Sequence, residues 1–117
     1  MRTTLTMRAS PEDYARLRAE AHRLAEQLAR LGAVKVILFG SLARGRVSLF
    51  SDVDLLALFD DDRSPRALSR WVYQHIDARE SVDLIAYSVR DFEQARQRPF
   101  WRQALQHSEV LYDRSAA

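Results

Sequence analysis

The sequence predicts a small α/β (α+β) domain in which a mixed sheet of about four strands is flanked by helices. Four short apolar runs alternate with helical patterns in the order helix, strand, strand, helix, strand, helix, strand. The 117 residues fit one ordinary domain, and no internal repeat or linker divides them. We therefore expect a single domain over 1–117, with an N-terminal helix at about 11–31 and a core at about 34–112.

The first helix is expected to begin where the serine N-cap Ser10 precedes a proline at the first helical position. Apolar residues then recur at spacings of three and four until Gly32 ends the helix. Pairs four residues apart, such as Arg16 and Glu20, are expected on its solvent side. The apolar stripe could form a dimer seam, but its short length favours packing against the chain's own sheet. A homo-oligomer stays open.

The apolar runs at 34–39, 53–59, 82–87 and 109–112 predict the strands. Further helices are expected after the cap at Ser64, after Ser88, and from Pro99 to about His107. His75 is expected on the apolar face of the helix that follows Ser64. The Phe and Trp residues are interpreted as core rather than as a platform for stacking bases, because no basic groove accompanies them.

Composition excludes several classes of protein. Eighteen basic residues against 16 acidic ones give a net charge of only +2, and the arginines are spread along the chain, so direct nucleic-acid binding is not expected. The absence of cysteine excludes disulfides, thiolate zinc sites and cysteine nucleophiles. No apolar run approaches the ~20 residues of a membrane span. The N-terminus lacks an apolar signal core, so we expect a cytoplasmic protein without a membrane partner.

A glycine-bounded loop, Gly40-Ser41-Leu42-Ala43-Arg44-Gly45, follows the first expected strand directly. Gly40 lets backbone approach a ligand closely, and Ser41 opens a short helix whose free N–H groups suit phosphate. Turns of this kind are common, so the loop alone is weak evidence for phosphate binding.

Three aspartates stand at strand positions. Asp52 and Asp54 are two residues apart at the start of the second strand and therefore project from the same face. An isolated pair would most simply cap a neighbouring turn. Asp83, however, lies inside the third apolar run and can meet the pair if the two strands are neighbours. Three carboxylates facing a phosphate loop are typical of two-metal phosphoryl or nucleotidyl transfer, and Mg²⁺ prefers such oxygen ligands.

The string GSLARGRVSLFSDVDLLALF contains a Gly-Ser pair followed after ten residues by Asp-x-Asp. This spacing resembles the signature of the DNA polymerase β-like nucleotidyltransferase superfamily. The fuller pattern is similar to that of its minimal nucleotidyltransferase (MNT) family. The matching positions are Ser41, Ala43, Arg44, Gly45, Ser51, Asp52, Asp54 and Leu55. The run SVDLIAYSVRDF also looks like that family's third-aspartate strand, so the resemblance extends over about 34–112.

The resemblance implies a role for each candidate residue. Asp52 and Asp54 would bind both Mg²⁺ ions of a two-metal site, and Asp83 would bind the catalytic one. Gly40 and Ser41 would hold the β- and γ-phosphates of ATP, the expected substrate. Arg44 would contact phosphate or acceptor.

MNT proteins are typically antitoxins of all-helical HEPN ribonuclease toxins, and some transfer AMP from ATP to a tyrosine of the toxin. The resemblance therefore implies an adenylyltransferase whose partner is a HEPN-domain toxin. One alternative is an antitoxin that neutralises its toxin by binding alone, which would have no need of clustered carboxylates. Another is an enzyme acting on a small molecule or RNA, as larger relatives do with an additional domain. The base preference and the number of AMP units stay open.

The loop before the metal aspartates departs from the family pattern. Leu49 and Phe50 are large and apolar, whereas relatives tend to be polar there. Adjacent side chains of an extended segment point apart, so both are difficult to bury together. We expect at least one of them to be exposed and to contact the toxin or a second copy of the chain.

Overall fold

The structure is a computed structural model that describes residues 10–47 and 51–116. Leu49 and Phe50, and with them the expected contact loop, lie outside the described residues. In chain order the elements are α1 (Pro11–Arg30), β1 (Ala33–Phe39), α2 (Gly40–Ala43), β2 (Val53–Phe59), α3 (Pro65–His75), β3 (Val82–Ser88), α4 (Val89–Ala95), α5 (Pro99–Ala104), the 3₁₀ helix η1 (Leu105–His107) and β4 (Glu109–Asp113).

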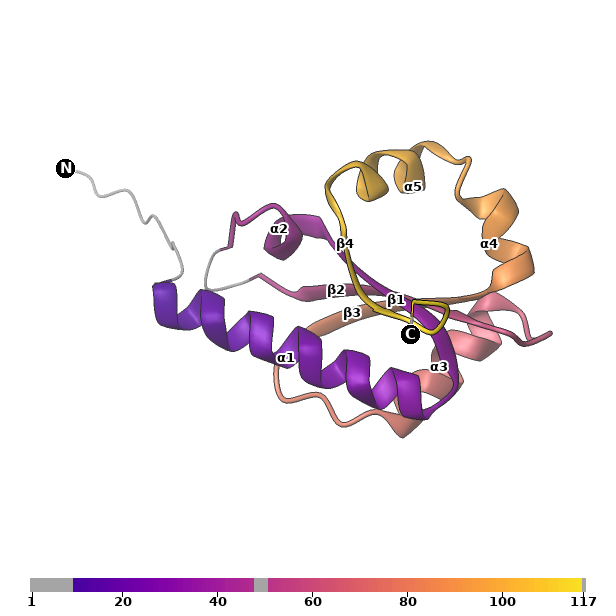
Figure 1. Cartoon of the computed structure of the whole chain (residues 1–117), viewed down its shortest axis with the longest axis horizontal. Coiled ribbons are helices and arrows are strands. Elements are labelled where there is room, and N and C mark those ends of the chain that lie inside the picture. Colours follow the sequence, from indigo (N-terminus) through magenta and orange to yellow (C-terminus); the bar gives the residue numbers. More distant parts are fainter. Residues whose placement is uncertain (1–9, 48–50, 117) are drawn as a thin grey trace.

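The four strands form one mixed sheet in the order β3-β2-β1-β4. β1 pairs antiparallel with both β2 and β4, whereas β2 and β3 run parallel. The parallel pair is joined by a crossover through α3, as parallel strands require. Figure 1 shows helices on both sides of the sheet, so the predicted fold class is confirmed.

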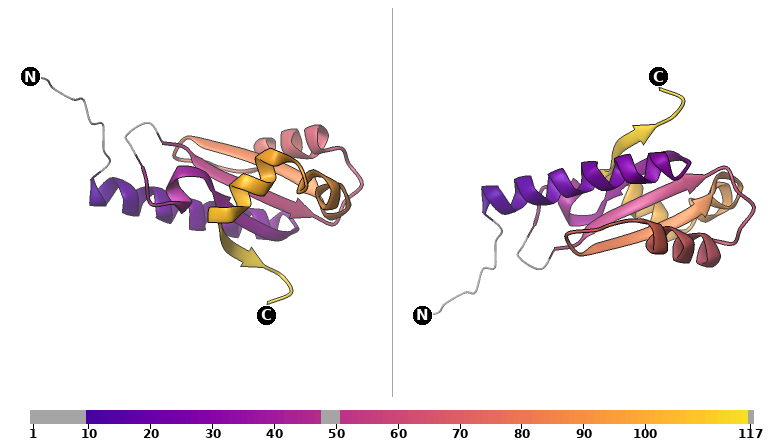
Figure 2. Two further views of the ribbon diagram at one scale, coloured as in Figure 1. Left: turned by 90° about the horizontal axis from the view of Figure 1, so that it is seen from above. Right: turned by 90° about the horizontal axis from the view of Figure 1, so that it is seen from below.

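α1 and α3 cover one face of the sheet (Figures 1 and 2). Ser10 caps α1 as expected, because its hydroxyl accepts from the backbone N–H of Asp13 while the Asp13 carboxylate accepts from the N–H of Ser10. Leu24 and Leu28 are fully buried against the strands. The apolar stripe of α1 thus packs on the chain's own sheet, the favoured of the two alternatives.

α4 and α5 cover the opposite face over part of its length. Phe92 of α4 and Trp101 of α5 are buried there against Ile37 and Leu58. Their rings meet edge to face with centroids 5.3 Å apart. Such aromatic contacts fix the two short helices on the sheet.

Two expectations about individual side chains are wrong. Glu20 is buried rather than on the solvent side of α1, and Arg16 pairs with Asp13 and Glu80 instead. His75 is exposed rather than in the core, because it lies in the last turn of α3 and stacks against Trp71 at the surface. Helical periodicity places a residue on a face, but it does not say how far the covering elements extend.

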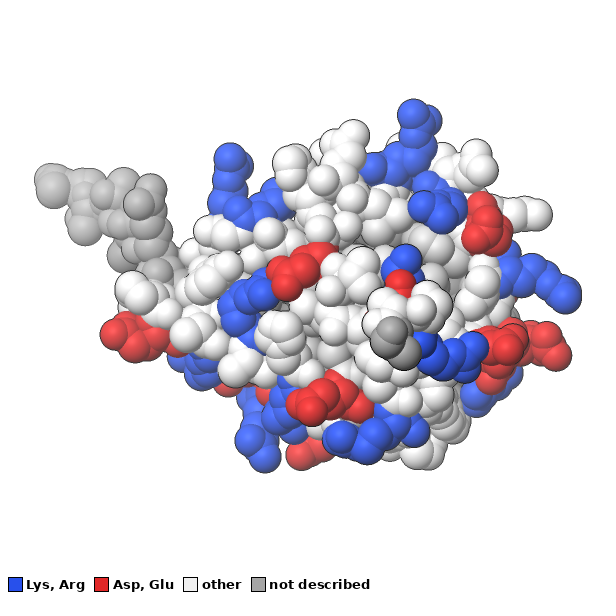
Figure 3. All heavy atoms as spheres, viewed as in Figure 1, with Lys and Arg blue, Asp and Glu red and all other residues white. Residues whose placement is uncertain are grey.

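Basic and acidic side chains alternate over the face drawn in Figure 3, without a continuous basic stripe. No helix in the described part of the chain is both long and apolar enough to cross a membrane.

Candidate active site

Asp54 of β2 and Asp83 of β3 are direct partners in the parallel ladder. Partners in a ladder project from the same face of a sheet, so the two carboxylates lie side by side. The residues that follow at every second position, Leu56 and Leu58, belong to the core under α4 and α5. The two aspartates therefore stand at the uncovered end of an otherwise apolar sheet face.

Gly40 follows the last residue of β1, and that residue, Phe39, is the antiparallel partner of Asp54. Gly40 has φ +75°, a conformation that side chains strongly disfavour. A Cβ atom at position 40 would lie 2.9 Å from Cγ of Asp54 and would overlap its carboxylate oxygen. A glycine is therefore needed at position 40 to make room for the Asp54 carboxylate, whether or not a ligand is bound. It lets the loop pass directly over that carboxylate.

The electrostatics of the site centre on Asp54. Partial burial, and then the negative charges of Asp83 and Asp52, raise the pKa of its carboxyl to about 6 against the opposing effect of the Arg44 guanidinium. Burial and like charges both disfavour the ionised form. The carboxylates thus repel one another without enough positive charge nearby to compensate. A bound cation would reduce this repulsion.

A cavity of about 410 Å³ opens at this point. Its lining includes five of the six predicted site residues: Gly40, Ser41, Arg44, Asp54 and Asp83. Asp52 lies just before β2 and is exposed outside this lining. The Ser41 hydroxyl donates to Oγ of Ser51 over 3.4 Å, which links the loop to the segment that leads into β2.

The described residues contain no group of three or more acidic, His or Cys side chains close enough to enclose a metal ion. Asp52 and Asp83 are exposed, and only Asp54 is half-buried. The oxygen donors thus suit a hard cation in type, but they flank the cavity rather than form a closed cage.

The sequence did not predict the contribution of α5 to this cavity. Phe100, Gln103 and Ala104 of that helix all line it. Phe100 is 57% exposed, which corrects the assignment of every Phe and Trp to the core. The sequence held one signal: Phe100 and Trp101 are adjacent in a helix, so both cannot face the same core.

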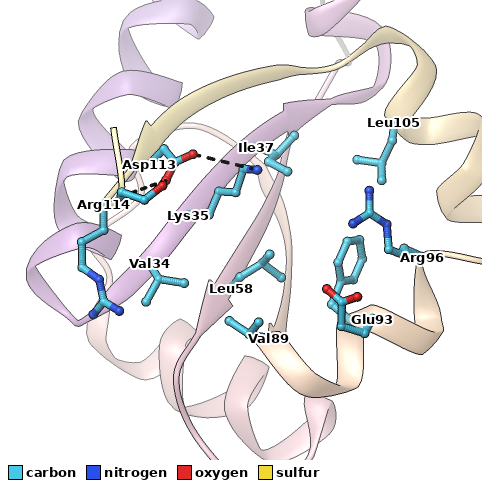
Figure 4. Close-up of a pocket in the computed structure, with 12 residues that line it drawn as sticks. Val34, Lys35, Ile37, Leu58, Val89, Glu93, Arg96, Leu105, Asp113 and Arg114 are labelled. Carbon is cyan, nitrogen blue, oxygen red and sulfur yellow. Dashed lines mark hydrogen bonds and ion pairs between the residues drawn. The ribbon is translucent and has the colours of Figure 1, made fainter. Parts of the chain in front are cut away.

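A second cavity of about 370 Å³ lies over the far end of the same sheet face, between β1, α4 and the C-terminal segment (Figure 4). Its floor is apolar, and Lys35 on its rim pairs with Asp113 over 4.0 Å. It holds none of the predicted site residues. The predicted chemistry therefore points to the aspartate cavity rather than to this one.

Comparison with known proteins identifies the family of the chain. Residues 21–109 match the family model described as "Nucleotidyltransferase domain". The match spans most of the chain and includes every predicted site residue, so the chain belongs to the nucleotidyltransferase domain family. The membership supports nucleotidyl transfer with a nucleoside triphosphate as substrate.

Two solved structures are similar to this chain. A protein from Sulfolobus solfataricus named as a candidate nucleotidyltransferase superposes with a TM-score of 0.65 at 21% identity, covering 89% of this chain and 86% of its own. Another, named as a candidate minimal nucleotidyltransferase, has a TM-score of 0.55 at 29% identity, covering 86% and 98%. The first likeness supports the fold alone, and the second supports the minimal family. Comparison with curated protein sequences gives no match.

Proposed function

We propose that this chain is a Mg²⁺-dependent adenylyltransferase that moves AMP from ATP to a tyrosine of a HEPN-domain ribonuclease toxin in the cytoplasm, and so acts as its antitoxin. The observation that supports this best is the pairing of Asp54 with Asp83 at a cavity that Gly40, Ser41 and Arg44 also line. Acidic groups on one side and phosphate-binding groups on the other suit a metal-bound triphosphate.

The carboxylates fit the cation that this reaction needs. Asp52 and Asp54 would hold both Mg²⁺ ions, and Asp83 would hold the catalytic one. Burial and then like-charge repulsion raise the pKa of Asp54, and bound cations would offset that repulsion. When bound, the ions supply Lewis acidity for the phosphates and for the acceptor oxygen.

The chain's own groups position the reactants. Gly40 and Ser41 bind the β- and γ-phosphates, and the Arg44 guanidinium offsets their charge. The acceptor oxygen forms a bond to the α-phosphorus, the bond from that phosphorus to the oxygen bridging to the β-phosphate breaks, and pyrophosphate leaves. The exposed carboxylate of Asp83 accepts the proton of the acceptor hydroxyl.

A tyrosine on another protein is a suitable acceptor for this geometry. Asp83 and Asp52 are exposed to solvent, so a side chain carried on a large partner can reach them. The likeness to a candidate minimal nucleotidyltransferase at 29% identity supports the same class of function.

The test mixes the purified chain with a purified HEPN-domain ribonuclease, Mg²⁺ and ATP labelled at the α- or the γ-phosphate. Only the α-label should appear on the HEPN protein, and replacing its acceptor tyrosine by phenylalanine should abolish labelling. Asp54→Asn should lower the transfer rate at least 100-fold while leaving the fold intact. Full transfer by Asp54→Asn would exclude the assignment.

The two alternatives give different results in the same experiment. An antitoxin that works by binding alone would suppress the ribonuclease without labelling it, and Asp54→Asn would suppress it equally well. An enzyme for RNA or a small molecule would place the α-label on those acceptors and leave the HEPN protein unlabelled.

A further inference from the structure

The part of the aspartate cavity that α5 lines is uncharged, unlike the rest of its lining. The residues that α5 contributes are Phe100, Gln103 and Ala104. The remaining lining includes the cation Arg44 and the carboxylates Asp54 and Asp83. The cavity therefore combines charged groups suited to metal-bound phosphates with uncharged groups suited to a flat, weakly polar group.

Phe100 differs from every other aromatic ring near it. Trp101, Phe92 and Phe39 are 3%, 4% and 5% exposed, whereas Phe100 is 57% exposed. Phe100 contacts Trp101 and Phe39 edge to face, with centroid separations of 4.9 and 6.2 Å. The ring is thus held from two sides while more than half of its surface is open.

The position of Phe100 relative to the phosphate loop is defined by Phe39. Phe39 packs against Phe100 and is joined directly to Gly40, and it is also the ladder partner of Asp54. One aromatic residue therefore separates the exposed ring from the loop and from the carboxylates. A nucleotide with its phosphates at the loop would have its base within reach of α5.

Gln103 lies one helical turn after Phe100 on α5 and lines the same cavity. Residues three apart in a helix share a face, so the amide stands beside the ring. A glutamine amide has both a donor and an acceptor, and this pair matches the N6 amine and N7 of adenine.

We propose that Phe100 stacks on the nucleobase of the bound triphosphate and that Gln103 hydrogen-bonds its edge, so that α5 is the base-recognition element of this enzyme. The inference rests on the proposed function, because it assumes phosphates at Gly40 and Arg44. Stacking on an aromatic ring is sequence-tolerant, whereas the amide supplies the preference for adenine.

The experiment compares the affinities of ATP and of inorganic tripolyphosphate, each with Mg²⁺, by calorimetry on the full chain. Phe100→Ala should weaken ATP binding by about 5- to 150-fold, the range for loss of one base stack. Its affinity for tripolyphosphate, which has no base, should be unchanged. Phe100→Trp should retain ATP affinity, and Phe100→Leu, which keeps an apolar side chain without a π face, should resemble Phe100→Ala.

Tyr14→Ala is the matched control, because Tyr14 is an exposed aromatic on α1 outside the cavity. It should bind both ligands as the wild type does. Gln103→Leu should reduce the preference for ATP over inosine triphosphate, in which a carbonyl replaces the N6 amine.

The outcomes separate this inference from the proposed function. If wild type binds neither tripolyphosphate nor ATP, both are wrong. If it binds both ligands and Phe100→Ala or Phe100→Leu binds ATP unchanged, base recognition by α5 is wrong while the phosphate and metal site stands. Equal loss of ATP and tripolyphosphate in both Phe100 variants would also overturn the inference, because stacking on a base cannot affect a ligand that has none.

Discussion

Gly40 and Asp54 lie so close that no side chain fits between the loop and the carboxylate. The Asp54 Cγ and Cβ atoms would be 2.9 and 3.2 Å from a Cβ atom at position 40. The neighbour cannot withdraw easily, because Asp54 stands on a strand paired on both sides. The loop that begins at Gly40 and the carboxylate pair are therefore one packed unit, and a change in either should alter both.

Gly40→Ala should accordingly reduce nucleotidyl transfer about 100-fold, since a displacement of about 1 Å at a reacting group costs this much. It should also lower the free energy of unfolding, because alanine at a positive φ costs about 1–2 kcal/mol before any overlap is counted. Transfer rates and denaturant unfolding measure the two effects.

Gly32→Ala is the matched control for backbone strain. Gly32 has φ +108°, but a Cβ atom there would meet nothing within 4 Å. This variant should lose stability and keep its transfer rate. Equal loss of activity in both variants would mean that general destabilisation, rather than contact with Asp54, explains the effect at position 40.

The ionisation of Asp54 should make the metal-free protein less stable as pH rises. Its pKa is raised from 3.8 to about 6 in the folded state, by burial first and then by Asp83 and Asp52. Between these values the folded chain retains a proton that the unfolded chain has released, so the free energy of unfolding falls with increasing pH. Allowing for partial exposure, the loss is about 1–2 kcal/mol.

Carboxylates stabilised by arginines, such as Asp61 beside Arg63, titrate with the opposite sign. The measurement is therefore the difference between wild type and Asp54→Asn, in a chelator, at pH 4 and pH 7. Asp54→Asn should become the more stable protein at pH 7 by the stated amount. A difference that does not depend on pH would contradict the raised pKa.

The buried carboxylate of Glu20 should be a major source of stability. Burial disfavours its charge, but the Arg23 guanidinium and the backbone N–H groups of Arg79 and Glu80 outweigh this and lower the pKa of Glu20. Glu20 thereby ties α1 to the segment that leads into β3 and Asp83. Glu20→Gln should cost about 2 kcal/mol in the free energy of unfolding, because hydrogen bonds to a charged acceptor are the stronger kind.

Glu26→Gln, on the exposed side of the same helix, is the comparison and should change stability by less than about 0.5 kcal/mol. Both variants are measured by urea unfolding at pH 7. If the two substitutions cost the same, the buried network contributes nothing beyond helix propensity.

The sequence predicted features that depend on neighbouring residues and missed those that depend on residues far along the chain. The strands followed from local apolar runs. The sequence predicted that Asp83 meets Asp54 only if their strands are neighbours, and the structure supplies that condition, because β2 and β3 are paired. Glu20 was misplaced because its partners Arg79 and Glu80 are 59 and 60 residues away. Phe100 was assigned to the core because only the tertiary structure shows that Trp101 occupies that position instead.

Mg²⁺ should stabilise the wild-type chain, and more strongly at pH 7 than at pH 4. Bound cations offset the repulsion among Asp52, Asp54 and Asp83, so at saturating Mg²⁺ the loss of stability that the ionisation of Asp54 causes should disappear. Asp52→Asn and Asp83→Asn remove exposed charges and should change metal-free stability by less than about 0.5 kcal/mol. They should nevertheless abolish stabilisation by Mg²⁺, as Asp54→Asn should. Thermal unfolding of each variant with and without Mg²⁺ measures this loss, and undiminished stabilisation of Asp83→Asn would exclude Asp83 from the metal site.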